Sequence, residues 1–212
     1  MRKSSPRKTV VGATAVLAMM LTGCATQSAD GESAAPSSAA SEPASEPVPA
    51  PPETEELLAA WDLDGMTSVE IIDHLDRLAP AERPTDLMAS VRPGDLMLTA
   101  DTEEISLDVP EDRFYLSVAP YVDQTHECFY HSLTTCLGEL DEVELQVRIV
   151  DESNDEVLVD ETRTTFDNGF TGFWLPRDLE GTLEVTHDGK TGTTRFTTDE
   201  DAPTCLTTLQ LA

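Results

Sequence analysis

The feature that most constrains the fold is an alternating run in the second half of the chain. Apolar side chains occupy every second position from residue 143 to residue 149, and polar or charged side chains fill the positions between them. Successive side chains of a strand point to opposite faces, so this run predicts a strand with one buried face and one solvated face. A second layer must therefore cover the apolar face.

Similar short segments, separated by turn residues, continue from residue 95 to the end of the chain. The predicted strands are 96–100, 104–109, 114–119, 143–151, 156–165, 171–175, 181–187, 193–197 and 204–211. Asp188-Gly189 is a dipeptide that favours a tight hairpin. Many short strands without intervening helices predict an antiparallel, sandwich-like β domain over residues 93–212.

A small helical segment is expected ahead of it, over residues 53–92. Thr67 and Glu70 have the spacing of a capping box, and an apolar stripe of helical period follows as far as Leu78. The polar side of this helix would carry Asp73, His74, Asp76 and Arg77. One further helical turn is expected over 86–90. Two short helices are not stable alone, so the stripe must pack on the rest of the chain or form a homodimer with a second copy. The fold class is α+β, mainly β.

The N-terminus has the pattern of a bacterial lipoprotein signal, residues 1–23. Four basic residues precede an apolar run over 10–21, which is shorter than the roughly 20 residues of a spanning helix. The run ends in Leu-Thr-Gly-Cys, the pattern of a lipobox, so Cys24 would carry the lipid. The chain is therefore expected to be exported and lipid-anchored to the outer face of a bacterial membrane. An ordinary signal peptide with an incidental cysteine is the alternative.

Residues 24–52 are rich in Ala, Ser, Pro and Glu and almost free of large apolar side chains. Such a composition predicts a disordered linker, which would hold the folded part away from the membrane. The formal net charge of the whole chain is −28, and removal of the basic signal makes it more negative still. This charge argues against nucleic acid and anionic lipid headgroups as partners, because both bind basic surfaces.

Two histidines and two cysteines lie within eleven residues, at His126, Cys128, His131 and Cys136. With Cys24 assigned to the lipid, Cys205 makes the cysteine count of the exported domain odd, which is unusual because pairing leaves one thiol over. Thiolates and imidazoles are ligands that soft ions such as Cu(I) prefer. The residues alone predict a copper or zinc site. The alternative is a disulfide such as Cys128–Cys136, with the third thiol buried.

Four motifs in this part of the chain resemble those of the CueP family of exported copper-binding proteins. They are Thr-His-Glu-Cys-Phe-Tyr-His-Ser-Leu at 125–133 with Cys136 and Gly-Glu-Leu at 138–140, Phe-Tyr-Leu-Ser-Val-Ala-Pro at 114–120, Gly-Phe-Thr-Gly-Phe-Trp-Leu-Pro-Arg at 169–177, and Pro-Thr-Cys at 203–205. The likeness extends from Leu57 to Leu211. It implies that Cys128, Cys136 and Cys205 are the functional thiols and that His126 and His131 take part in binding copper.

The resemblance implies copper buffering, tolerance or handover to a copper-accepting exported protein, with Cu(I) bound and Cu(II) reduced by the thiols as a further step. It assigns no catalytic residue, so enzymatic activity is left open. The familiar members are soluble periplasmic proteins, whereas the lipobox here favours action near the membrane. The alternative function is a disulfide-stabilised interaction module at the cell surface without metal. An odd thiol beside two histidines argues against that alternative.

Overall fold

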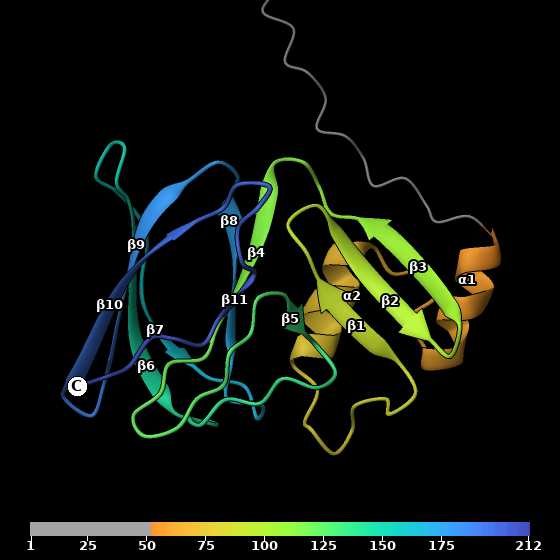
Figure 1. Ribbon diagram of the computed structural model, residues 1–212, viewed down its shortest axis with the longest axis horizontal. Coiled ribbons are helices and arrows are strands. Elements are labelled where there is room, and N and C mark those ends of the chain that lie inside the picture. Colours follow the sequence, from red (N-terminus) through yellow and green to blue (C-terminus); the bar gives the residue numbers. More distant parts are fainter. Residues whose placement is uncertain (1–51) are drawn as a thin grey trace, which may run out of the picture. The chain divides into compact units, whose positions relative to one another are not determined.

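The structure, a computed structural model, describes residues 52–212 (Figure 1). The predicted signal peptide, the lipid site at Cys24 and the predicted linker up to residue 51 lie outside the described residues. Among residues 52–212, no helix has both the length and the apolar character needed to cross a membrane.

The described chain consists of short helices followed by strands. The helices are α1 (Pro52–Leu58), the 3-10 helix η1 (Ala59–Trp61) and α2 (Ser68–Asp76). The strands are β1 (Met88–Val91), β2 (Asp95–Ala100), β3 (Glu103–Asp108), β4 (Arg113–Val118), β5 (His131–Ser132), β6 (Glu144–Asp151), β7 (Glu156–Thr164), β8 (Thr171–Pro176), β9 (Glu180–His187), β10 (Lys190–Thr197) and β11 (Cys205–Leu206). The mainly β, α+β class predicted from the sequence is confirmed.

The strands form three sheets, with the orders β3-β2-β1-β5, β10-β9-β6-β7 and β11-β4-β8. Neighbouring strands are antiparallel except β11, which pairs with β4 in parallel. The predicted strand over 204–211 is therefore mostly wrong: only two of its residues join a sheet, and Gln210 adds an isolated bridge to Tyr121.

The second and third sheets pack on each other as the predicted sandwich. On β6 the three apolar residues Leu145, Val147 and Ile149 are fully buried, and the polar residues between them are exposed. They share one core with Phe114 of β4 and Phe173 of β8. The alternation thus predicted both the strand and the face that it buries.

The helices pack on the first sheet rather than standing apart (Figure 1). Ile71, Ile72 and Leu75 of α2 are buried in one core with Leu96 and Leu98 of β2. The stripe was expected to pack on the rest of the chain or on a second copy, and the chain's own sheet covers it.

The helical turn expected over residues 86–90 is wrong, because β1 occupies most of that stretch. Ala89 and Val91 are buried, and β1 pairs with β2 on one side and with β5 on the other. A strand of four residues is too short for its alternation to be recognised without its neighbours.

The capping box of α2 is confirmed. The Thr67 hydroxyl accepts from the Glu70 backbone N–H at 3.3 Å, and the Glu70 carboxylate accepts from the Thr67 N–H at 2.8 Å. This cap fixes where α2 starts and, with it, the place of Asp76 at the last turn.

We expect Thr67→Ala to lower the free energy of unfolding by about 1 kcal/mol, because an orphan backbone donor loses its acceptor. Thr67→Ser keeps the hydroxyl and serves as the matched control. Urea unfolding followed by circular dichroism measures both variants. An equal loss in the two would show that the cap is not what Thr67 contributes.

Candidate metal centre

The segment 126–136 carries four of the five nominated donors and is held by bonds to distant parts of the chain. The Leu133 N–H donates to the Ala89 carbonyl of β1 at 2.9 Å, and the Cys205 N–H donates to the Phe129 carbonyl at 3.1 Å. The segment is thereby fixed between the first sheet and the end of the chain.

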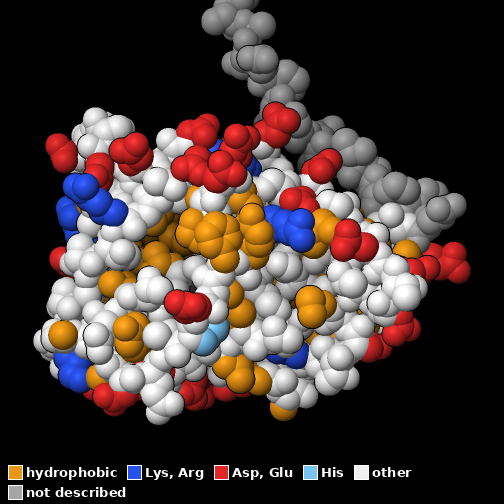
Figure 2. Space-filling view, viewed as in Figure 1, with side chains coloured by type: hydrophobic (Ala, Val, Ile, Leu, Met, Phe, Trp, Pro, Cys, Tyr) orange, Lys and Arg blue, Asp and Glu red, His pale blue; other side chains and the backbone are white. Residues whose placement is uncertain are grey.

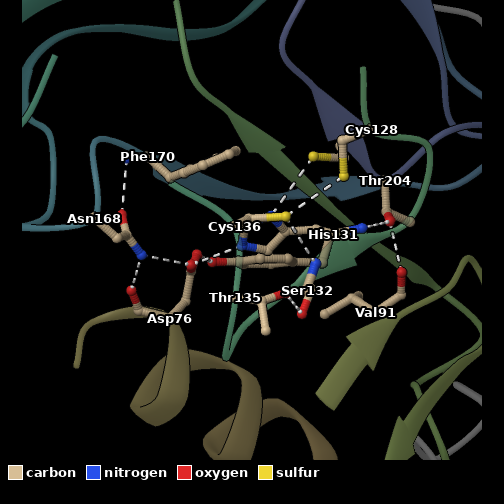
Figure 3. A network of polar contacts seen from close by, with 12 residues as sticks. Asp76, Val91, Cys128, His131, Ser132, Thr135, Cys136, Asn168, Phe170 and Thr204 are labelled. Atoms are coloured by element: carbon tan, nitrogen blue, oxygen red, sulfur yellow. Dashed lines mark hydrogen bonds and ion pairs between the residues drawn. The ribbon is translucent and has the colours of Figure 1, made fainter. Parts of the chain in front are cut away.

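Cys205 lies on β11 and pairs with Ser117 of β4. Its neighbour Thr204 is buried, and the Thr204 hydroxyl accepts from the His131 N–H at 3.0 Å and donates to the Val91 carbonyl at 2.6 Å (Figure 3). One hydroxyl therefore joins three segments that are far apart in sequence.

All three cysteines of the described chain are free thiols. The Cys128 and Cys136 sulfurs lie 3.5 Å apart, and the Cys205 sulfur lies 3.7 Å from Nδ1 of His131. The disulfide considered between Cys128 and Cys136 is not formed. A small apolar cluster of Ala119 and Phe170 surrounds the sulfurs.

The nominated donors fall into two groups of three. His126, Cys128 and Cys136 form one, and His131, Cys136 and Cys205 form the other, with the donor atoms within 4.8 Å of one another in each group. Cys136 belongs to both. The sequence nominated these five residues but not their division into two groups.

A buried carboxylate, Asp76, holds His131 from the other side (Figure 3). Nε2 of His131 donates to Asp76 at 2.9 Å, and both side chains are fully buried. The same carboxylate accepts from the Tyr115 hydroxyl at 2.5 Å and from the Asn168 amide at 3.2 Å. The sequence placed Asp76 on the polar side of α2, and this was wrong. The histidine that pairs with it lies 55 residues further on.

Tyr115 reaches this carboxylate because β8 has a glycine beside it. A Cβ at Gly172 would collide with the Tyr115 hydroxyl. The absence of a side chain at Gly172 is therefore a condition for the hydrogen bond from Tyr115 to Asp76.

Burial and pairing set the protonation of this network. Burial alone would lower the pKa of His131, but the charge and hydrogen bond of Asp76, together with those of Cys136, outweigh burial and raise that pKa to about 9. Burial alone would raise the pKa of Asp76, and the charge and hydrogen bond of His131 lower it instead. The two groups therefore form a buried ion pair at neutral pH.

The thiols share their protons unequally. Hydrogen bonds from Cys128 and Cys205, followed by the charge of His131, lower the pKa of Cys136. Donation to Cys136 raises the pKa of Cys128 to about 11, and hydrogen bonds to the other two sulfurs raise the pKa of Cys205. The lowered pKa of Cys136 favours its thiolate, which is the form of a cysteine that binds a metal.

Arg83 is a second residue that sequence patterns did not nominate, because Arg83-Pro84 resembles a linker. It is 7 % exposed, and its Nη1 donates to the Cys136 carbonyl at 2.8 Å. A buried cation at this position favours the thiolate form of Cys136.

Two large apolar side chains of the segment 126–136 are exposed. Figure 2 shows one face on which apolar side chains gather below a group of carboxylates. Phe129 and Tyr130 are 54 % and 39 % exposed, and Arg92 lies over the Tyr130 ring.

The family model described as periplasmic copper-binding protein CueP matches residues 70–210. The chain belongs to the CueP family. A crystal structure of S.CueP is 39% identical to it, with a TM-score of 0.71, and the match covers 78% of this chain and 100% of that one. None of the curated proteins matches the chain. The CueP match includes Asp76, both histidines and all three thiols, and the family is periplasmic and binds copper.

We expect Asp76→Asn to lower the free energy of unfolding of the reduced, metal-free chain by about 3 kcal/mol, because it leaves a buried cation without its counter-charge. Asp64→Asn, at an exposed carboxylate near the same helix, is the control and should change stability by less than about 0.5 kcal/mol. Urea unfolding at pH 7 measures both. Equal effects of the two substitutions would contradict the assigned role of Asp76.

The opposite shifts of His131 and Cys136 predict a specific pH dependence of stability. From pH 6.5 to 8 the folded chain keeps a proton on His131 that the unfolded chain loses, so this contribution to stability falls as pH rises. Folded Cys136 has lost a proton that an unfolded thiol keeps until about pH 8.5, so its contribution rises and offsets the first.

We therefore expect the stability of the reduced, metal-free wild type to change little over this range. Cys136→Ser should lose up to about 2 kcal/mol from pH 6.5 to 8, because the part of the His131 contribution that Asp76 maintains is no longer offset. Urea unfolding in the presence of a chelator and a reductant checks this. A Cys136→Ser profile as flat as that of the wild type would rule out the assigned pair of shifts.

Proposed function

We propose that this CueP-family chain binds Cu(I) through Cys128, Cys136 and Cys205 together with His126 and His131. The observation that carries the proposal is the convergence of these five donors on two overlapping groups of three. They come from a loop, a two-residue strand and the far end of the chain, so their meeting is a property of the fold.

The donor set and its surroundings favour Cu(I). Thiolate and imidazole are soft or borderline ligands, and Cu(I) is satisfied by few of them, whereas structural zinc sites are usually closed by four ligands. Cys136 and Cys205 are buried beside Ala119 and Phe170, which limits access of water and hard oxygen ligands.

The same thiols have a redox role in this proposal. Formation of one disulfide between the Cys128 thiol and the Cys136 thiolate, whose sulfurs are 3.5 Å apart, releases two electrons and one proton. Those electrons reduce two Cu(II) to two Cu(I), so a full turnover requires a later reductant of the thiol–disulfide class.

The predicted lipid on Cys24 would keep this activity at the outer face of the membrane. Buffering, or handover to an exported copper-accepting protein, suits a tethered chain better than delivery over a distance. A homodimer through the helical segment remains a prediction, and sedimentation of the exported chain would test it.

The test is an anaerobic Cu(I) competition titration against a chromogenic chelator. It uses residues 24–212 with Cys24→Ser in every sample, so that no fourth thiol or lipid contributes. We expect Cys136→Ser and Cys205→Ser each to weaken binding by at least about tenfold, equivalent to 1.4 kcal/mol. Cys128→Ser should weaken binding by less, because Cys128 is the least buried of the three thiols. Thr135→Ala, at an exposed hydroxyl within the same segment, is the control and should bind like the parent.

Failure of the parent chain to compete for Cu(I) would refute the proposal. The remaining candidate would then be the cell-surface interaction module without metal, in which the cysteines have only a structural role.

A further inference from the structure

The two donor groups differ in their access to solvent. In the first, which we name the outer triad, His126 is exposed and Cys128 is half-buried. In the second, the inner triad, His131 and Cys205 are 0 % and 3 % exposed. Cys136 is common to both, and an ion arriving from solvent meets the outer triad first.

We propose that copper is taken up at the outer triad and passes to the inner triad while it stays bound to Cys136. This inference rests on the proposed function and adds an order of events to it. Uptake and retention are assigned to different ligands of the same centre.

The chemistry of the two triads makes such a transfer feasible. Each consists of two sulfurs and one imidazole, so the exchange of His126 and Cys128 for His131 and Cys205 changes neither the number nor the type of donors. Because Cys136 belongs to both triads, the ion is never released. No electron is transferred, and the bonds broken to the outer pair are matched by bonds formed to the inner pair. Nδ1 of His131 and the Cys205 thiol each lose a proton as they bind the ion. One of these protons goes to Cys128 as it is released, and the other goes to solvent.

The inner triad is the more rigid of the two. Nε2 of His131 is held by Asp76 at 2.9 Å, which directs Nδ1 toward the Cys205 sulfur. The backbone of His131 is fixed by Thr204 at 3.0 Å. A donor held in place before the ion arrives loses less conformational freedom on binding, so the inner triad should bind the ion more tightly.

The outer triad is suited to capture. The His126 carbonyl is held by the Thr207 hydroxyl at 2.6 Å, but its imidazole is exposed, and its ring lies 6.4 Å from that of Phe170. An accessible imidazole can bind an incoming ion before the buried donors are reached.

The test measures rates and affinity in the same chain. Cu(I) transfer from and to a chromogenic chelator is followed by anaerobic stopped flow for residues 24–212 carrying Cys24→Ser. We expect His126→Ala to slow uptake and release together by about tenfold, so that affinity changes less than either rate. His131→Ala should mainly accelerate release, by about tenfold, and so weaken affinity. His74→Ala, at an exposed histidine on α2, is the control and should behave like the parent.

Because His131 belongs to a buried ion pair, His131→Ala can cause a folding defect. A second pair of variants therefore tests the same division without removing His131. Cys128→Ser removes an outer donor and Cys205→Ser removes an inner one, and the same division between rate and affinity is expected. X-ray absorption at one Cu(I) per chain gives an independent readout: the imidazole contribution should persist in His126→Ala and disappear in His131→Ala.

Equal effects of outer and inner substitutions on both rates would overturn the inference and indicate one undivided site. Loss of the imidazole contribution in His126→Ala would overturn it as well. These outcomes differ from failure of the proposed function, in which the unsubstituted chain itself takes up no copper.

Discussion

The buried ion pair between Asp76 and His131 is the interaction on which the rest of the structure depends. Neither side chain is exposed to solvent, and either charge alone would be strongly destabilised at that position. The pair therefore fixes the end of α2 and the middle of the segment 126–136 relative to each other. Tyr115 and Asn168 complete the carboxylate's hydrogen bonds, so β4 and the loop before β8 are held in the same arrangement.

Through Tyr115 of β4, the network around this pair also links the two larger cores of the described chain. The helices and first sheet form one apolar cluster, the sandwich forms another, and the sulfurs lie in a small third cluster with Phe170. Polar groups in such a position specify one arrangement of the surrounding elements, because a shift of any of them leaves a donor or acceptor unpaired. The precision that a metal centre requires is thus supplied by hydrogen bonds, while the apolar clusters supply most of the stability.

Sequence patterns predicted the structural features that depend on residues close together in the chain. The buried face of β6 and the capping box at Thr67 depend on residues within a few positions, and the sequence predicted both. Asp76 was assigned to the wrong side of its helix because His131, whose charge compensates the buried carboxylate, is 55 positions away. The two-residue β11 has too little length for a pattern, and its parallel partner is β4, far back in the chain. The five donors were nominated by chemical type, but only the fold separates them by depth.

The place of Cys205 in the chain has a consequence for how the centre is completed. It follows Cys136 by 69 residues, and it is positioned by the parallel pairing of β11 with β4 and by Thr204. A chain that crosses a membrane from its N-terminus exposes Cys128 and Cys136 well before Cys205. The inner triad is therefore completed later than the outer triad, and a chain truncated before β11 lacks it altogether.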